Sequence, residues 1–176
     1  LGYGIRIPGT KGLQCKGVPG YIFKHTREFF PGDLEDLERK LHWGKSHGGC
    51  AAVYIEPIGP ESGTRPVTKE FVKGCEELAH KYDALLICDE VVSGFRIGMS
   101  GAQGYYGIDP DLTIFGKVVA GGYPGAGGVG GHKDCMAHLG AGLDSSGKKV
   151  SKAFVGGTLA ATPISCVGGY HMLCEI

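Results

Sequence analysis

The residues best suited to chemistry in this sequence are a lysine and an aspartate, each of which closes a short apolar run. Lys117 follows the run "LTIF" and one glycine, and Asp89 follows "ALLIC". A lysine amine can form a Schiff base with an aldehyde, and a carboxylate can pair with the protonated nitrogen of a pyridine ring. Two such residues, delivered by the ends of two buried strands, could hold an aldehyde-bearing pyridine ring between them.

The segments around these residues predict an α/β fold with a mostly parallel sheet. Three short apolar runs, at 50–55, 84–88 and 112–115, are typical of strands buried on both faces, and 127–131 is a possible fourth strand. We also expect a short strand within 21–29, where apolar and polar residues alternate.

Helices are expected between the strands. Leu34, Leu37 and Leu41 form an apolar stripe that Asp33 can cap, and a longer stripe begins after Thr68. Strand, helix and strand in this order imply right-handed crossovers, so the strands run parallel.

Ligands of such sheets collect at the carboxyl ends of the strands. Glu56, Asp89 and Lys117 all lie at such ends, so the pattern alone places them along one rim of the sheet. Each also has a structural interpretation, because a lysine past a strand is usually solvated and an acid there often closes a turn. The setting favours chemistry: we expect apolar neighbours to hold the stem of Lys117, and the buried backbone of Asp89 requires a partner for its carboxylate. Glu90 is interpreted as structural, bonded to turn amides.

The composition restricts the class of protein. Lysine plus arginine and aspartate plus glutamate both number 18 in 176 residues, which gives no reason to expect nucleic acid or an anionic membrane as a partner. We find neither a membrane-spanning apolar stretch nor a signal peptide. Seven cysteines, an odd number without framework spacing, fit reduced thiols in the cytosol. The length predicts one domain.

Other motifs are weaker. A glycine-rich match to G-x-G-x-x-G lacks a surrounding strand–turn–helix unit, and two groups have metal-like spacing without a clear four-ligand set, so no metal is expected. These motifs are Gly125, Gly127 and Gly130; His132, Cys135 and His138; and His42, His47 and Cys50.

Three phrases, "CDEVVSGFR", "GAQGYYGIDPDLTIFGKVVAGG" and "GGTLAATPIS", occur in this order. Together they resemble the class III, fold-type I aminotransferases, which depend on pyridoxal 5′-phosphate (PLP), and within them the glutamate-1-semialdehyde 2,1-aminomutases most. The resemblance implies that Lys117 bonds the cofactor aldehyde and shuttles a proton. It also implies that Asp89 pairs with the ring nitrogen and that Val91 packs on one face of the ring. Thr158 would reach across a homodimer interface to the phosphate of the neighbouring subunit's cofactor.

The resemblance covers nearly all of the chain. It implies that residues 1–176 are the central part of a large PLP-binding domain, with the N-terminal phosphate-loop region and the C-terminal domain absent. On this interpretation we expect the chain alone to bind PLP weakly through Lys117 and to be inactive.

Three functions remain open. The first is amine exchange within glutamate 1-semialdehyde, which gives 5-aminolevulinate. The second is an ω-aminotransferase with a keto-acid acceptor. The third is a non-catalytic piece whose sheet serves only folding or assembly.

Overall fold

A computed structural model describes residues 17–58, 67–125, 127–140, 142, 146–149 and 151–176. The elements that these residues form are, in chain order, η1 (Gly20–Phe23), α1 (Leu34–Lys45), β1 (Ala52–Ile55), α2 (Lys69–Lys81), β2 (Leu85–Asp89), α3 (Gly101–Tyr106), β3 (Leu112–Phe115), η3 (Lys117–Ala120), β4 (Gly128–Gly131), α4 (Lys133–Ala137) and α5 (Pro163–Glu175), where η denotes a 3-10 helix.

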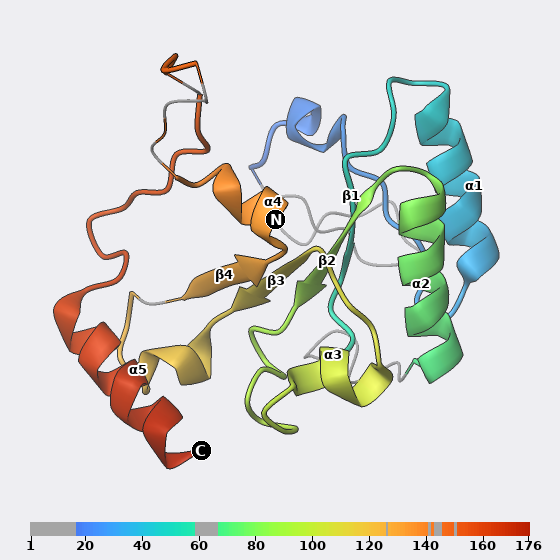
Figure 1. Cartoon of the computed structure of the whole chain (residues 1–176). Coiled ribbons are helices and arrows are strands. Elements are labelled where there is room, and N and C mark those ends of the chain that lie inside the picture. The colour runs from blue at the N-terminus through green and yellow to red at the C-terminus, as the bar shows by residue number, and fades with distance from the viewer. Residues whose placement is uncertain (1–16, 59–66, 126, 141, 143–145, 150) are drawn as a thin grey trace.

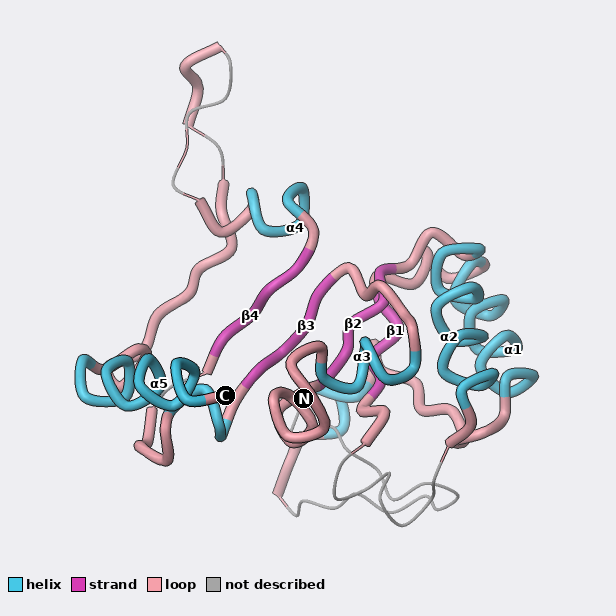
Figure 2. Tube along the Cα trace, turned by 60° about the horizontal axis from the view of Figure 1, so that its bottom comes forward, coloured by secondary structure: helices cyan, strands magenta, loops and turns pink. Residues whose placement is uncertain are grey.

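The four strands form one sheet in the order β1-β2-β3-β4 (Figure 2). β1 pairs with β2 and β2 with β3 in parallel, whereas β4 runs antiparallel to β3. The predicted α/β fold with a mostly parallel sheet and flanking helices is therefore confirmed, as are the predicted strands around residues 50–55, 84–88, 112–115 and 127–131.

The core lies between the sheet and two helices. α1 and α2 stand side by side against one face of β1 and β2 (Figure 1). Alternate residues of the strands point into this core, so Val53 and Leu86 are buried. The helices supply the other layer, with Leu37, Val72 and Cys75 among its buried residues. Complete burial of a side chain such as Leu86 contributes roughly 1.5–3 kcal/mol.

Both helices of this layer begin where the sequence predicts. The carboxylate of Asp33 accepts a hydrogen bond from the backbone N–H of Asp36 at 2.8 Å, and the hydroxyl of Thr68 accepts one from that of Phe71 at 3.2 Å. Each cap satisfies a backbone donor that the first helical turn leaves unpaired.

The strand expected within 21–29 was a wrong prediction. Residues 20–23 form η1, and the N–H of Lys24 donates to the carbonyl of Tyr21 at 3.1 Å. This local hydrogen bond closes a turn, and the segment pairs with none of the four strands. The alternation of apolar and polar residues in 21–29 is too weak to form a strand without such pairing.

The other face of the sheet is the one that matters for function. Tyr54 of β1 and Ile87 and Asp89 of β2 point away from α1 and α2 and are half-buried. Among the described residues, no helix is long and apolar enough to cross a bilayer.

Candidate active site

Asp89 is the last residue of β2, and two donors hold its side chain. The backbone N–H of Val91 donates to Oδ1 at 2.9 Å, and the hydroxyl of Tyr54 donates to Oδ2. Tyr54 lies opposite Ile87 in the register, two residues before Asp89 on the same face, so the tyrosine reaches the carboxylate diagonally across the strand pair. Asp89 is thus half-buried and hydrogen-bonded.

Lys117 begins η3, directly beyond β3. Asp89 pairs with Ile114 in the register, so Lys117 stands three residues past the point opposite Asp89. The structure therefore brings the two residues to the carboxyl ends of neighbouring parallel strands. Lys117 has a φ of 49°, in the left-handed region that residues other than glycine seldom adopt. Such conformations cluster at functional sites.

The apolar enclosure expected around the stem of Lys117 is absent from the described part of the molecule. The side chain of Lys117 is exposed and makes no hydrogen bond or ion pair to the described residues. The strand β3 ends at Phe115, and the chain turns into the 3-10 helix η3 after Gly116. Lys117 therefore lies outside the sheet.

Val91 connects the two strand ends. A Cβ added to Gly116 would lie 3.1 Å from Cγ1 of Val91, so this apolar side chain sits against the residue that precedes Lys117. The absence of a side chain at Gly116 permits this close approach. Val91 thus lies between the carboxylate that its own N–H holds and the backbone that leads to the lysine.

Glu90 has a structural role in the turn that follows β2, as the sequence predicted. It is only 1% exposed. Its carboxylate accepts hydrogen bonds from the hydroxyl of Ser93 at 2.5 Å and from the backbone N–H groups of Ala102 and Gln103, both at 2.8 Å. A single buried side chain therefore ties the turn after β2 to the start of α3.

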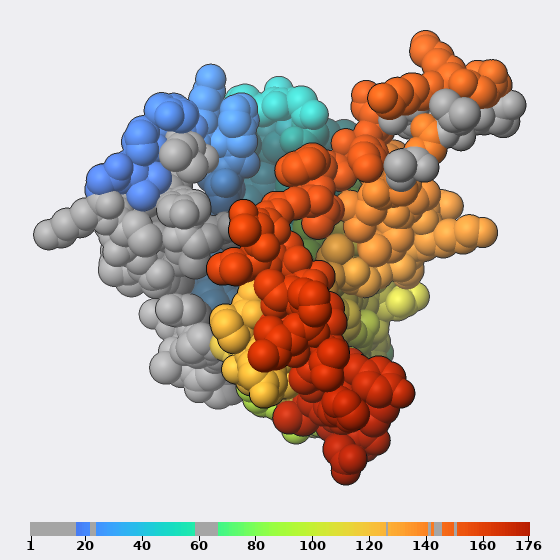
Figure 3. Space-filling view, turned by 90° about the vertical axis from the view of Figure 1, so that its left-hand side faces the viewer, coloured from blue at the N-terminus to red at the C-terminus, as the bar shows by residue number. Residues whose placement is uncertain are grey.

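Thr158 lies in the exposed segment before α5 and makes no hydrogen bond within the described structure. This segment turns against the connection between β3 and β4, where the N–H of Ala161 donates to the carbonyl of Gly125 at 3.1 Å. The following helix, α5, packs on η3 (Figure 3, red over yellow). No described contact brings Thr158 to Asp89 or Lys117.

Tyr54 is the site residue that the sequence reasoning missed. Burial raises the pKa of its phenol above the usual 10, and the hydrogen bond and charge of Asp89 raise it further. The phenol therefore stays protonated, as a donor to Asp89. The signal was present in the sequence, because a tyrosine in an otherwise apolar strand has a polar group that needs a partner.

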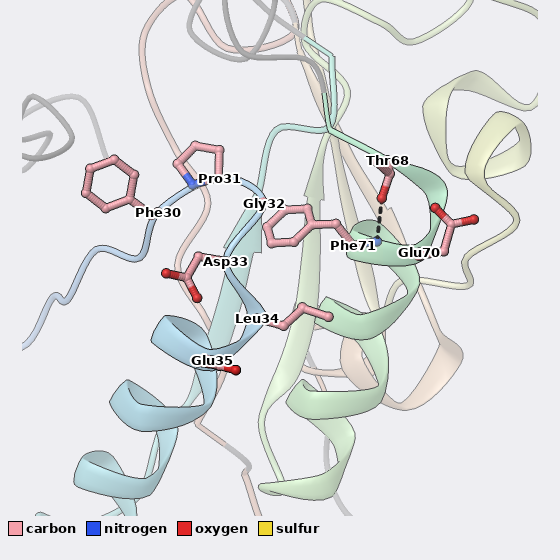
Figure 4. Close-up of a pocket in the computed structure, with 9 residues that line it drawn as sticks. All are labelled: Phe30, Pro31, Gly32, Asp33, Leu34, Glu35, Thr68, Glu70 and Phe71. Carbon is pink, nitrogen blue, oxygen red and sulfur yellow. Dashed lines mark hydrogen bonds between the residues drawn. The ribbon is translucent and has the colours of Figure 1, made fainter.

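One hollow of the described surface lies away from these residues. It is bordered by the starts of α1 and α2, including Pro31, Asp33, Thr68 and Phe71 (Figure 4). Asp33 and Thr68 are engaged as helix caps, and none of the predicted site residues lines this hollow. Among the described residues no group of three metal-ligating side chains gathers.

Comparison with known proteins adds sequence relatives. The model of the class-III aminotransferase family matches residues 26–176. Glutamate-1-semialdehyde 2,1-aminomutase 1 of Staphylococcus epidermidis is 38% identical over 168 residues, which are 95% of this chain and 37% of the relative. The enzyme of the same name from Staphylococcus aureus is 37% identical over the same span. The chain thus spans 37% of the length of these curated relatives.

Solved structures agree. An omega-transaminase from Sphaerobacter thermophilus superposes with a TM-score of 0.76 at 30% identity, over 92% of this chain and 35% of that one. A glutamate-1-semialdehyde aminomutase variant from Pseudomonas aeruginosa PAO1, in complex with PMP, gives a TM-score of 0.67 at 29% identity over the same shares of the two chains. A transaminase with PLP bound gives 0.75 at 28% identity. Since the family model covers most of the chain, this chain belongs to the class III aminotransferases.

Proposed function

We propose that this chain supplies the PLP site of an enzyme that transfers amino groups. The observation that supports the proposal most is the position of Asp89 and Lys117 at the carboxyl ends of two hydrogen-bonded parallel strands, with Val91 between them. Family membership is the second support.

The described residues fit the cofactor. Each oxygen of the Asp89 carboxylate accepts one hydrogen bond and has a further lone pair for a pyridine N–H. Val91 offers an apolar surface beside Gly116. A side chain at position 116 would crowd Val91. The exposed amine of Lys117 has no competing ion pair in the described structure.

Each residue then has a defined task. When bound, PLP supplies an electron sink that stabilises negative charge on the carbon beside the amine. Asp89 holds the proton on the ring nitrogen, which keeps the sink effective. Lys117 binds the cofactor through Nζ and moves protons at that atom, and Val91 supports one face of the ring.

For the substrate, we propose amine exchange within glutamate 1-semialdehyde to give 5-aminolevulinate. The support is the name shared by the two curated relatives at 37–38% identity. The alternative is transfer from an ω-amine to a keto acid, which the omega-transaminase structure supports at 30% identity.

Two assays on the same preparation separate these possibilities. With PLP present, the full-length enzyme that is proposed to contain this chain is given glutamate 1-semialdehyde alone, or an ω-amine with a keto acid, and product is measured. Formation of 5-aminolevulinate without a keto acid is the expected result, and Lys117→Ala should abolish it. Activity that survives intact in Lys117→Ala contradicts the proposed role of Lys117. No product in either assay from a full-length protein that is folded by circular dichroism supports the non-catalytic alternative.

We also propose that the protein forms a homodimer through the segment around Thr158. Its neighbours Phe154, Val155 and Leu159 are 88%, 71% and 66% exposed, an unusual concentration of uncovered apolar surface. Light scattering should give a dimer mass for the wild type and a monomer mass for Phe154→Asp. A monomeric wild type would count against the proposed assembly.

A further inference from the structure

Tyr54 is a polar side chain on a strand that otherwise serves the core. Its neighbours Val53 and Ile55 are 4% and 8% exposed and pack against the helical layer. Tyr54 points to the opposite face and is half-buried there, with its hydroxyl on Asp89.

The two donors to Asp89 come from different elements. Tyr54 belongs to β1 and reaches Oδ2, while the Val91 N–H belongs to the turn after β2 and reaches Oδ1 at 2.9 Å. A carboxylate held at both oxygens cannot rotate freely about its last torsion, so its remaining lone pairs keep fixed directions.

The phenol can only act as a donor here. Burial raises the pKa of Tyr54, and the nearby charges of Asp89 and Glu56 oppose ionisation as well. The hydroxyl proton therefore remains available to Asp89 at neutral pH.

We propose that Tyr54 is a positioning residue, which fixes the orientation of the Asp89 carboxylate so that it can pair with the ring nitrogen of PLP. The inference rests on the proposed function. It differs from a purely structural role, in which the tyrosine ring would only cover the sheet and its hydroxyl would be dispensable.

The matched variants are Tyr54→Phe and Tyr82→Phe. Both keep the ring and remove a hydroxyl that donates to a carboxylate, but Tyr82 donates to Glu38, at 3.3 Å, on the helical layer. Tyr82→Phe thus controls for the loss of a tyrosine–carboxylate hydrogen bond away from the site.

The first measurement needs no cofactor. Hydrogen exchange of the Val91 amide, followed by NMR, reports how firmly Oδ1 of Asp89 is held. We expect exchange about fivefold faster in Tyr54→Phe, the equivalent of one net hydrogen bond, and no change in Tyr82→Phe. An unchanged rate in Tyr54→Phe would overturn the inference.

The second measurement is made on the full-length enzyme that is proposed to contain this chain. It is the dissociation constant of pyridoxamine 5′-phosphate, which has an amine in place of the aldehyde and cannot bond Lys117. It reports the non-covalent contacts to the ring. We expect binding roughly three- to tenfold weaker in Tyr54→Phe and unchanged in Tyr82→Phe. Equal affinity in all three proteins would also overturn the inference.

The two measurements separate this inference from the proposed function. If the wild type binds no pyridoxamine 5′-phosphate, the proposed function fails, and Val91 exchange still decides whether Tyr54 holds Asp89. If Tyr54→Phe does not fold, 3-fluorotyrosine at position 54 serves instead. It is a stronger donor of the same shape, so it should slow the exchange of Val91, and unchanged or faster exchange would contradict the inference.

Discussion

At the scale of single residues, the arrangement of the site depends on how its carboxylates are held. Asp89 is held by a tyrosine and an amide, whereas the adjacent Glu90 is buried and accepts three hydrogen bonds. The two adjacent acidic residues at the end of β2 therefore have different roles. Asp89 faces the proposed cofactor, and Glu90 stabilises the turn that includes Val91.

Removing the Glu90 side chain should destabilise the fold markedly. Glu90→Ala leaves the hydroxyl of Ser93 and two backbone donors without their partner in a buried place, so we expect a loss of about 3 kcal/mol in the free energy of unfolding. Urea denaturation measures this. Glu77→Ala, at an exposed position of α2, is the control and should change stability by less than about 0.5 kcal/mol. Equal effects of the two substitutions would contradict this account of Glu90.

The sequence was informative about which residues matter and less so about their surroundings. The apolar runs before Asp89 and Lys117 predicted that both residues end strands, because hydrophobic continuity is a local property. The partner of Asp89 was not predicted, since the contact with Tyr54 depends on the register between β1 and β2. The exposure of Lys117 was also missed, because its left-handed conformation turns the chain out of the sheet.

At the scale of elements, the helix α5 and the short η3 are joined by close backbone contact. A Cβ at Gly169 of α5 would lie 2.0 Å from the carbonyl oxygen of Val119 in η3. Because η3 starts with Lys117, this contact links the C-terminal helix to the proposed cofactor lysine. This close packing could not be predicted from the sequence, because it depends on a fit between residues that are distant in the chain.

The same substitution in two helices should have opposite effects. Gly169→Ala forces α5 away from η3 and should lower stability by about 2 kcal/mol, as overpacking commonly does. Gly44→Ala in α1 meets nothing closer than 3.6 Å, so it should raise stability by up to about 1 kcal/mol through helix propensity. Thermal unfolding of both variants provides the comparison. A neutral Gly169→Ala would show that the close contact is not required.

At the scale of the whole molecule, Asp111 at the start of β3 ties several elements together. Its Oδ2 accepts hydrogen bonds from the N–H of Leu86 in β2 at 2.8 Å and from His80 of α2 at 2.9 Å, and His132 beyond β4 lies 3.6 Å from Oδ1. Burial raises the pKa of Asp111, but the hydrogen bonds from Leu86 and His80 and the charges of both histidines outweigh it, so the net pKa is below 3.8.

This depressed pKa gives stability a defined pH dependence. The ionised form is favoured in the folded state, so its contribution is present above the unfolded pKa near 3.8 and is lost as pH falls through the lower folded value. We expect Asp111→Asn to be less stable than the wild type at neutral pH, with a difference that narrows as the pH falls from about 5 to about 3. Urea denaturation at several pH values tests this, and a constant difference would contradict it.

The mostly parallel sheet was predictable from sequence, because strands that alternate with helices are joined by right-handed crossovers. The hydrogen bonds of Asp111 could not be predicted from the sequence, because they join residues that are distant in the chain. The same limit applies to Thr158, whose proposed contact lies with a second copy of the chain.

The central claim is that Lys117 and Asp89 together form a PLP site, and covalent trapping tests it most directly. The chain is incubated with limiting PLP, reduced with borohydride and digested, and the modified lysine is identified by mass spectrometry. The account predicts that the pyridoxyl group is found on Lys117 in preference to other exposed lysines, such as Lys133 and Lys152, and that Asp89→Asn reduces this preference. Label spread evenly over the exposed lysines, with no effect of Asp89→Asn, would contradict it.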